Sequence, residues 1–215
     1  MNGLLDQLTM APLGAGVLGL ILALFFYFRV KALPEGNETM NMIARYIREG
    51  SMAFLAREYK VLAGYSVVVF GLLYLAFSSH GTGLLAGSCF VLGAFLSLLS
   101  GFIGMKAATY ANVRTTQAAR EGSRANALLT ALDGGAVMGL CVAATALLGL
   151  GALFFVFKNN PNLATVLHSF AVGASSIALF ARIGGGIYTK AADVGSDIAG
   201  KVVEGIPEDD PRNPG

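Results

Sequence analysis

The residues best suited to chemistry lie near the carboxyl end of the chain, where charged side chains recur at helical spacing. Lys190, Asp193, Asp197, Lys201 and Glu204 follow one another at offsets of 0, 3, 7, 11 and 14 residues. On an α-helix these offsets fall on one face, so two carboxylates and two ammonium groups share it. Hard oxygen ligands, used sparingly, suit Mg²⁺ bound together with phosphate. The spacing therefore indicates a site for a metal-chelated polyanion.

The spacing of the two aspartates has an energetic consequence. Like charges four residues apart destabilise an isolated helix by about 0.2–0.5 kcal/mol, and a divalent cation between Asp193 and Asp197 would remove that repulsion. The alternative is a solvated helix face with an Asp197–Lys201 pair, because stripes of charge are common on exposed helices. Spacing alone leaves both interpretations open.

Composition identifies the class of protein. The chain is 55% hydrophobic and 13% charged, whereas soluble domains carry about 25% charged residues. It is therefore an integral membrane protein, and its net charge of +2 is too small to indicate a nucleic-acid partner. Cys89 and Cys141 lie in apolar runs and are expected to be buried rather than paired or metal-bound. Neither His80 nor His168 has a partner at metal-ligand spacing.

Five apolar stretches are long enough, or nearly so, to cross a bilayer core of about 30 Å. The fold class is therefore all-α, a polytopic transmembrane helix bundle with five spans in this chain. The expected spans are Ala11–Phe28, Val61–Phe77, Leu84–Met105, Ala136–Phe157 and Leu163–Ala181.

Two of the connecting segments also have a helical pattern. Asn37 can cap a helix that starts at Glu38 and runs on into the second span. The segment from Asn112 to Leu132 has a similar pattern, with its arginines, Arg114 among them, as the charged side. We expect both segments to lie at the membrane surface.

Basic residues divide unevenly between the two sides of the membrane. Of the 15 Lys and Arg residues, only Lys158 falls on the side of the short loops. The positive-inside rule therefore places the amino terminus outside and the carboxy-terminal tail in the cytoplasm. The residues on the cytoplasmic side are Arg29, Lys31, Arg45, Arg48, Arg57, Lys60, Lys106, Arg114, Arg120, Arg124, Arg182, Lys190, Lys201 and Arg212.

One long motif resembles a known family. The run Gly184–Asp197, followed by Lys201 and by Ile206–Pro214, closely resembles the signature of membrane-bound inorganic pyrophosphatases. These ion-translocating enzymes couple pyrophosphate hydrolysis to proton or sodium transport. The resemblance covers roughly Asn37 to Pro214, and its weaker stretches are Asn112–Thr115, Gly134–Leu140 and the region from Ile47 to Lys60.

The resemblance implies roles for the charged stripe and for the loop that follows it. Lys190 and Lys201 match lysines that hold the substrate phosphates. Asp193 and Asp197 match aspartates that bind the Mg²⁺ ions between protein and pyrophosphate. Glu208 matches the acidic residue of the cap loop beside the site and is the third candidate metal ligand, with Asp193 and Asp197. These roles agree with the chemistry of the side chains, since lysines act as phosphate point charges and carboxylates carry metal.

Arg182 ends the fifth span and precedes Gly184, Gly185 and Gly186. An arginine there either faces a polar path in the bundle or extends to the membrane surface as an anchor. The resemblance favours the first alternative, because Arg182 matches an arginine in the ion-conducting path below the hydrolytic centre.

Length is the large departure from the family. Its members are about three times as long, with about sixteen spans of about 20 apolar residues each. We therefore expect an amino-terminal fragment, with a naturally truncated product as the alternative. It is expected to be inactive alone and to have no catalytic residue of its own, because the resemblance places the family's general-base aspartates downstream of Gly215.

The expected function is that of a pyrophosphate-energised H⁺ or Na⁺ pump. It implies pyrophosphate, Mg²⁺ and the bilayer as partners, K⁺ as a further cofactor of some members, a homodimer, and no nucleic acid. The expected location is a prokaryotic plasma membrane, with a vacuolar-type membrane as the alternative. Two alternative functions stay open: a non-enzymatic helical membrane subunit whose tail docks a partner, and a fragment of a secondary transporter.

Overall fold

The computed structural model describes residues 2–207 and 210, with side chains from Met10 onward. Its helices are α1 (Asn2–Lys31), α2 (Glu38–Ser78), α3 (Gly83–Arg120), α4 (Arg124–Phe157) and α5 (Leu163–Ile198), followed by a π-helical turn, η1 (Ala199–Val203). The described residues contain no strand. Within these residues, five helices are long and apolar enough to cross a membrane, which confirms the predicted all-α class and the number of spans.

The helices extend well beyond the predicted spans because polar residues cap and continue them. The side chain of Asn37 accepts a hydrogen bond from the Met40 backbone N–H at 2.9 Å, as predicted, and α2 then runs unbroken through the second span. Such a cap satisfies one of the backbone donors that a helix start leaves open.

The helical pattern predicted from Asn112 to Leu132 is present, but it is divided between two helices. Helix α3 ends at Arg120, and a turn at Glu121–Ser123 separates it from α4. Gly122 has a φ of +82° there, a conformation that glycine adopts without steric cost. The side chain of Ser123 then caps α4 by accepting a hydrogen bond from the Asn126 backbone N–H at 3.2 Å. The turn at Gly122 and the cap at Ser123 therefore interrupt the helix, although the sequence on either side has a helical pattern.

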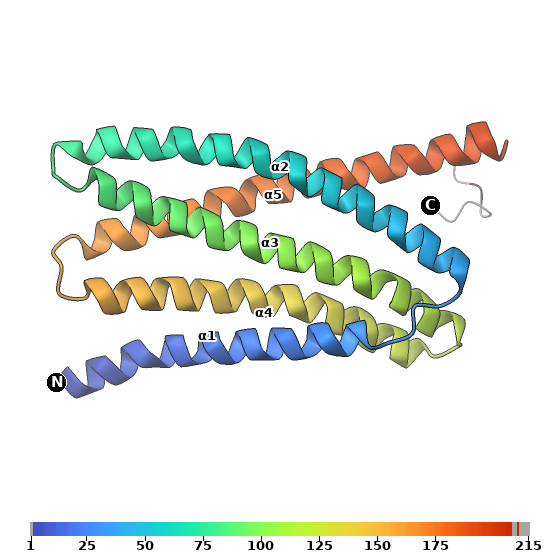
Figure 1. Ribbon diagram of the computed structural model, residues 1–215, viewed down its shortest axis with the longest axis horizontal. Helices are drawn as coiled ribbons and strands as arrows, with labels where there is room; N and C mark the ends of the chain where they lie inside the picture. The colour runs from blue at the N-terminus through green and yellow to red at the C-terminus, as the bar shows by residue number, and fades with distance from the viewer. Residues whose placement is uncertain (1, 208–209, 211–215) are drawn as a thin grey trace. The chain divides into compact units, whose positions relative to one another are not determined.

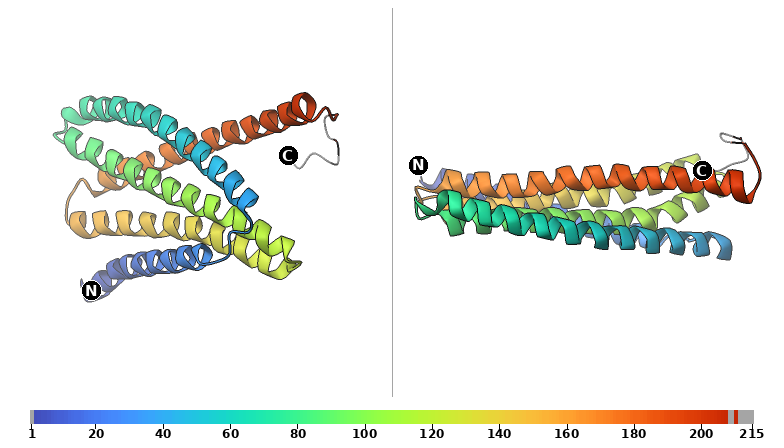
Figure 2. Two further views of the ribbon diagram at one scale, coloured as in Figure 1. Left: turned by 45° about the vertical axis from the view of Figure 1, so that its right-hand side comes forward. Right: turned by 90° about the horizontal axis from the view of Figure 1, so that it is seen from above.

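The chain divides into two compact units, Met1–Ala178 and Leu179–Gly215. In the first unit, α3 lies between α2 and α4, and α1 packs along α4 (Figure 1). The views in Figure 2 agree that the α2–α3 and α4–α5 connections lie at one end of this unit, and the α1–α2 and α3–α4 connections at the other. The two connections predicted to be basic are thus at the same end.

Glycines allow close helix contacts inside the first unit. A Cβ on Gly93 would overlap the carbonyl oxygen of Phe170, and a Cβ on Gly173 would overlap that of Phe90. Helices α3 and α5 therefore touch backbone to backbone through a reciprocal pair of glycines. Small residues permit such close approach in membrane bundles, where packing rather than hydrophobicity drives helix association.

Small and aromatic side chains fill the rest of the interior. One cluster joins α3, α4 and α5 through Cys89, Leu153, Val166 and Phe170. Cys141 lies in a second cluster, and both cysteines are free and buried, as predicted. Many large apolar side chains face outward, as expected of helices surrounded by lipid or by further helices.

Candidate functional site

The charged stripe lies on the second unit of the chain, on the carboxy-terminal half of α5. The helix continues without interruption through Gly184, Gly185 and Gly186. The Thr189 hydroxyl donates a hydrogen bond to the Gly185 carbonyl at 3.0 Å, which satisfies the hydroxyl within the helix. Arg182, one helical turn or less before the glycines, is exposed in this chain. An uninterrupted helix therefore connects Arg182 to the charged stripe.

Three of the predicted site residues share one face of α5. Lys190, Asp193 and Asp197 all precede the end of the α-helix at Ile198, so their spacing of three and four residues keeps them adjacent. The Lys190 Nζ lies 3.3 Å from the Asp193 Oδ2, with 77% and 54% of the side chains exposed. An exposed ion pair of this kind contributes little to stability, about 0–1 kcal/mol. The lysine and the carboxylate are therefore available to a ligand at small cost.

The two aspartates differ in their surroundings. Asp193 is exposed and faces the Lys190 ammonium, whereas Asp197, one turn further on, is half-buried. Between residues 2 and 207, no group of three or more His, Cys, Asp or Glu gathers at metal-binding distances. Two neighbouring carboxylates nevertheless fit Mg²⁺, which proteins commonly hold through one or two carboxylates while substrate phosphates and water complete its shell.

The expectation that the α-helix carries the stripe through Lys201 to Glu204 was wrong. The chain changes to a π-helical turn at Ala199–Val203, and the Glu204 N–H bonds to the Ala199 carbonyl at 3.0 Å, an i to i+5 pattern. Such π-turns recur at functional sites of helical proteins. The wider turn takes Lys201 and Glu204 out of the α-helical register, so spacing cannot assign them to the face of Asp193 and Asp197.

The helix ends immediately beyond this turn. Gly205 has a φ of +66°, and the Ile206 N–H closes the end by bonding to the Gly200 carbonyl at 3.0 Å. A glycine in the left-handed region is the usual way to stop a helix and turn the chain away from its axis. Glu208, the predicted residue of the capping loop, lies outside the described residues.

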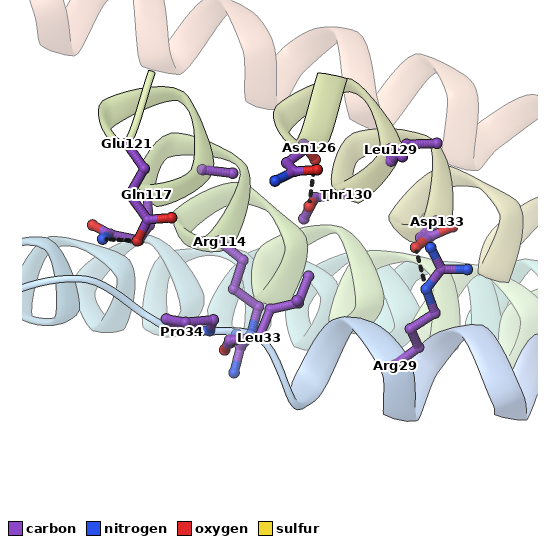
Figure 3. A pocket seen from close by; sticks show the side chains of 11 residues that line it. Arg29, Leu33, Pro34, Arg114, Gln117, Glu121, Asn126, Leu129, Thr130 and Asp133 are labelled. Carbon is purple, nitrogen blue, oxygen red and sulfur yellow. Dashed lines mark hydrogen bonds and ion pairs between the residues drawn. The ribbon is translucent and has the colours of Figure 1, made fainter. Parts of the chain in front are cut away.

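The first unit contains a second polar site, which the sequence pattern did not reveal. A pocket of about 250 Å³ lies between α1, α3 and α4. Figure 3 shows Arg29 pointing toward Asp133 at this pocket. The Arg29 Nε lies 3.1 Å from the Asp133 Oδ2, and only 9% of the aspartate side chain is exposed. Asp133 is the one acidic residue of α4. A lone carboxylate beside an apolar run was the feature of the sequence that could have indicated this polar site.

Arg114, predicted on the outer charged side of a surface helix, is instead buried, with 3% of its surface exposed. It donates hydrogen bonds to the carbonyls of Lys31 and Leu33 at 3.0 Å each, and to the Glu35 Oε1 at 2.6 Å. Those carbonyls lie at the end of α1 and just beyond it, where no backbone N–H of the helix is available to bond to them. Arg114 therefore ties the end of α1 to α3.

Both a family model and individual proteins match this chain over nearly its whole length. The family model described as inorganic H⁺ pyrophosphatase matches residues 17–215. A protein of Clostridium tetani, whose name describes a K(+)-stimulated pyrophosphate-energized sodium pump, is 50% identical over 93% of this chain and 28% of its own length. K(+)-insensitive pyrophosphate-energized proton pumps of Moorella thermoacetica and Methanosarcina mazei are each 47% identical, over 98% and 95% of this chain and 30% and 29% of their own lengths. The chain thus spans less than a third of these relatives.

Proposed function

We infer that this chain, which belongs to the inorganic H⁺ pyrophosphatase family, forms part of a pyrophosphate-energised ion pump. The relatives reported above are named as pumps of H⁺ or Na⁺, and the chain aligns with them over nearly its whole length. The proposed substrate is Mg²⁺-pyrophosphate, hydrolysed at the cytoplasmic face, with H⁺ or Na⁺ moved outward through the bundle. The groups that activate the attacking water belong to the parts of the relatives that this chain does not span.

Lys190 and Lys201 bind the phosphates of pyrophosphate, and Asp193 and Asp197 hold the Mg²⁺ that accompanies it. The ion pair of Lys190 with Asp193 supports these roles, because it keeps a cation and a carboxylate side by side before substrate arrives. Bound Mg²⁺ would neutralise charge on the transferring phosphoryl group. The lysines place point charges on phosphate oxygens, and Glu208 adds a carboxylate from the capping loop.

Helix α5 links hydrolysis to transport. Arg182 precedes Lys190 by eight residues, which is about 12 Å along a helix. Because α5 is continuous between them, a shift of the phosphate-binding end moves Arg182 as well. We propose that Arg182 lines the ion path, since an arginine at the edge of the hydrocarbon is costly unless it meets water or a partner.

The proposal extends to orientation and assembly. The end of the first unit that has the two basic connections faces the cytoplasm. The amino terminus lies outside, in agreement with the positive-inside rule. The assembled pump is a homodimer in a prokaryotic plasma membrane. K⁺ affects some relatives and not others, by their names, so K⁺ sensitivity varies within this group of sequences.

The observation that carries the proposal is the shared face of Lys190, Asp193 and Asp197 on a helix whose sequence matches the family. The test is Mg²⁺-dependent pyrophosphate hydrolysis by the product of the native reading frame that contains this chain. Asp193→Asn and Asp197→Asn should each lower the rate by about 100-fold, the scale on which single charge-stabilising groups act. The matched control is Glu204→Gln, which removes the same charge beyond the π-turn and should change the rate less than threefold. Equal losses in all three variants would count against the assignment.

A further inference from the structure

Three cations from three segments surround one aromatic ring in the first unit. The Tyr110 ring of α3 has the Arg48 Cζ at 4.4 Å from its centroid, the Arg114 Cζ at 5.5 Å and the Lys31 Nζ at 5.9 Å. Cations within about 6 Å of a ring are attracted to its face. The ring holds the cations close together, but it does not cancel their charge.

The protein compensates only one of these charges. Arg114 is buried and pairs with Glu35 at 2.6 Å. Lys31 and Arg48 have no carboxylate within ion-pair distance in the part of the chain that the structure describes. The Arg48 Nε is also buried without a hydrogen-bond acceptor. With Glu35 included, the cluster therefore has a net charge of +2 within the residues that the structure describes.

The depth of the cluster in the membrane identifies the kind of anion. The apolar run of α3 ends at Met105 and Lys106, and Tyr110 lies four residues beyond Lys106, about 6 Å along the helix. The headgroup layer on each side of the hydrocarbon is about 5–8 Å thick. Tyr110 therefore lies at headgroup depth, where tyrosine is enriched and where basic pockets between helices attract anionic lipids.

We propose that Lys31 and Arg48, stacked around Tyr110, form a binding site for the phosphate of an anionic phospholipid headgroup. The guanidinium and the ammonium supply charge-assisted hydrogen bonds to phosphodiester oxygens. Lys31 comes from the end of α1, Arg48 from α2 and Tyr110 from α3. A bound headgroup therefore joins three helices at the end of the unit where α1 turns into α2. The site does not depend on the pump function.

The test measures the lipid that stays bound to the intact product of the native reading frame. The protein is reconstituted in nanodiscs of phosphatidylcholine with a small fraction of phosphatidylglycerol, and retained lipid is counted by native mass spectrometry. Each of Lys31→Gln and Arg48→Gln should lower retention of phosphatidylglycerol by about fivefold, and the double variant by about 25-fold, with phosphatidylcholine unchanged. Tyr110→Phe keeps the ring and should retain the lipid.

Arg45→Gln is the matched control, because Arg45 lies on the same helix but pairs with Glu49 at 3.8 Å. It should retain phosphatidylglycerol as the unsubstituted protein does. The proposal is overturned if Arg45→Gln loses as much lipid as Arg48→Gln, or if the double variant loses none. Lys31 is exposed, so Lys31→Gln leaves the packing intact, and normal retention in that variant also overturns it. Displacement of the lipid by millimolar inorganic phosphate would assign the site to a free anion instead.

Discussion

Asp193 and Asp197 illustrate how a residue pair can be poorly suited to an isolated helix and well suited to a ligand. Their like charges one turn apart destabilise the helix by about 0.2–0.5 kcal/mol. Lys190 offsets part of this through its contact with Asp193, but Asp197 lies one turn further along. A cation shared by both carboxylates would relieve the remaining repulsion. In the metal-free protein, we therefore expect a small electrostatic repulsion between Asp193 and Asp197.

Arg114 is the residue whose loss should affect stability most among the polar groups described. Arg114→Met removes the charge-assisted hydrogen bond to Glu35 and leaves the carbonyls of Lys31 and Leu33 without donors. Removing one partner of a buried pair typically costs about 3–5 kcal/mol, and the low end is expected here because Glu35 is partly exposed.

The measurement for Arg114 is the free energy of unfolding in mixed detergent micelles. Arg120→Met is the control, since Arg120 is exposed on the same helix and should change stability by less than about 0.5 kcal/mol. If the two variants are equally stable, the network around the end of α1 is not the anchor that the contacts indicate.

At the scale of helices, α5 depends on how closely it approaches α3. Gly93 and Gly173 each face the other helix's backbone, so an added methyl group cannot be accommodated by a side-chain rotation. Gly93→Ala and Gly173→Ala should each lower the free energy of unfolding by about 1–3 kcal/mol, the usual cost of overpacking.

Gly139 provides the contrast for these two substitutions. It has the G-x-x-x-G spacing with Gly135, yet nothing lies within 4 Å of a Cβ built at Gly139. Gly139→Ala should therefore be neutral, or stabilising by about 0.5–1 kcal/mol through helix propensity. Thermal unfolding of the three variants, followed by circular dichroism, separates the cases. A loss of stability in Gly139→Ala as large as that in Gly93→Ala would contradict the proposed crossing.

The helices were predictable from sequence to different degrees. Apolar length alone revealed all five spans, and Asn37 was recognisable as a cap because its side chain acts on a neighbour three residues away. The turn at Gly122 was not recognised, since a single glycine competes there with a strong helical pattern. The π-turn at Ala199–Val203 left no signal in the spacing of charges, because that spacing was read with an α-helical period.

The candidate site was predictable only where its members are close in sequence. Lys190, Asp193 and Asp197 lie within eight residues, so helical geometry alone brings them together. Arg114 and the end of α1 are about eighty residues apart, and only tertiary packing joins them. The reciprocal glycines Gly93 and Gly173 are a similar case, because no local pattern distinguishes them from the glycines that face open space.

At the scale of the whole molecule, the two units differ in packing and in the residues that they carry. The first unit, Met1–Ala178, is a packed helical bundle with its own buried clusters and ion pairs. The second, Leu179–Gly215, carries the proposed phosphate and metal ligands, of which Lys190 and Asp193 are exposed. Ligands that lie on the surface of a helix are expected when further chain closes the site around the substrate. The relatives are more than three times as long as the matched segment, which agrees with this expectation.

The most direct test of the pump assignment uses inverted membrane vesicles that contain the product of the native reading frame. Magnesium and pyrophosphate are added outside, and phosphate release is recorded together with the H⁺ or Na⁺ content of the lumen. We predict Mg²⁺-dependent hydrolysis accompanied by accumulation of one of the two ions, with both rates lowered about 100-fold in Asp193→Asn. Vesicles that release phosphate no faster than vesicles lacking the protein, or that hydrolyse pyrophosphate with no ion entering the lumen, would contradict the assignment.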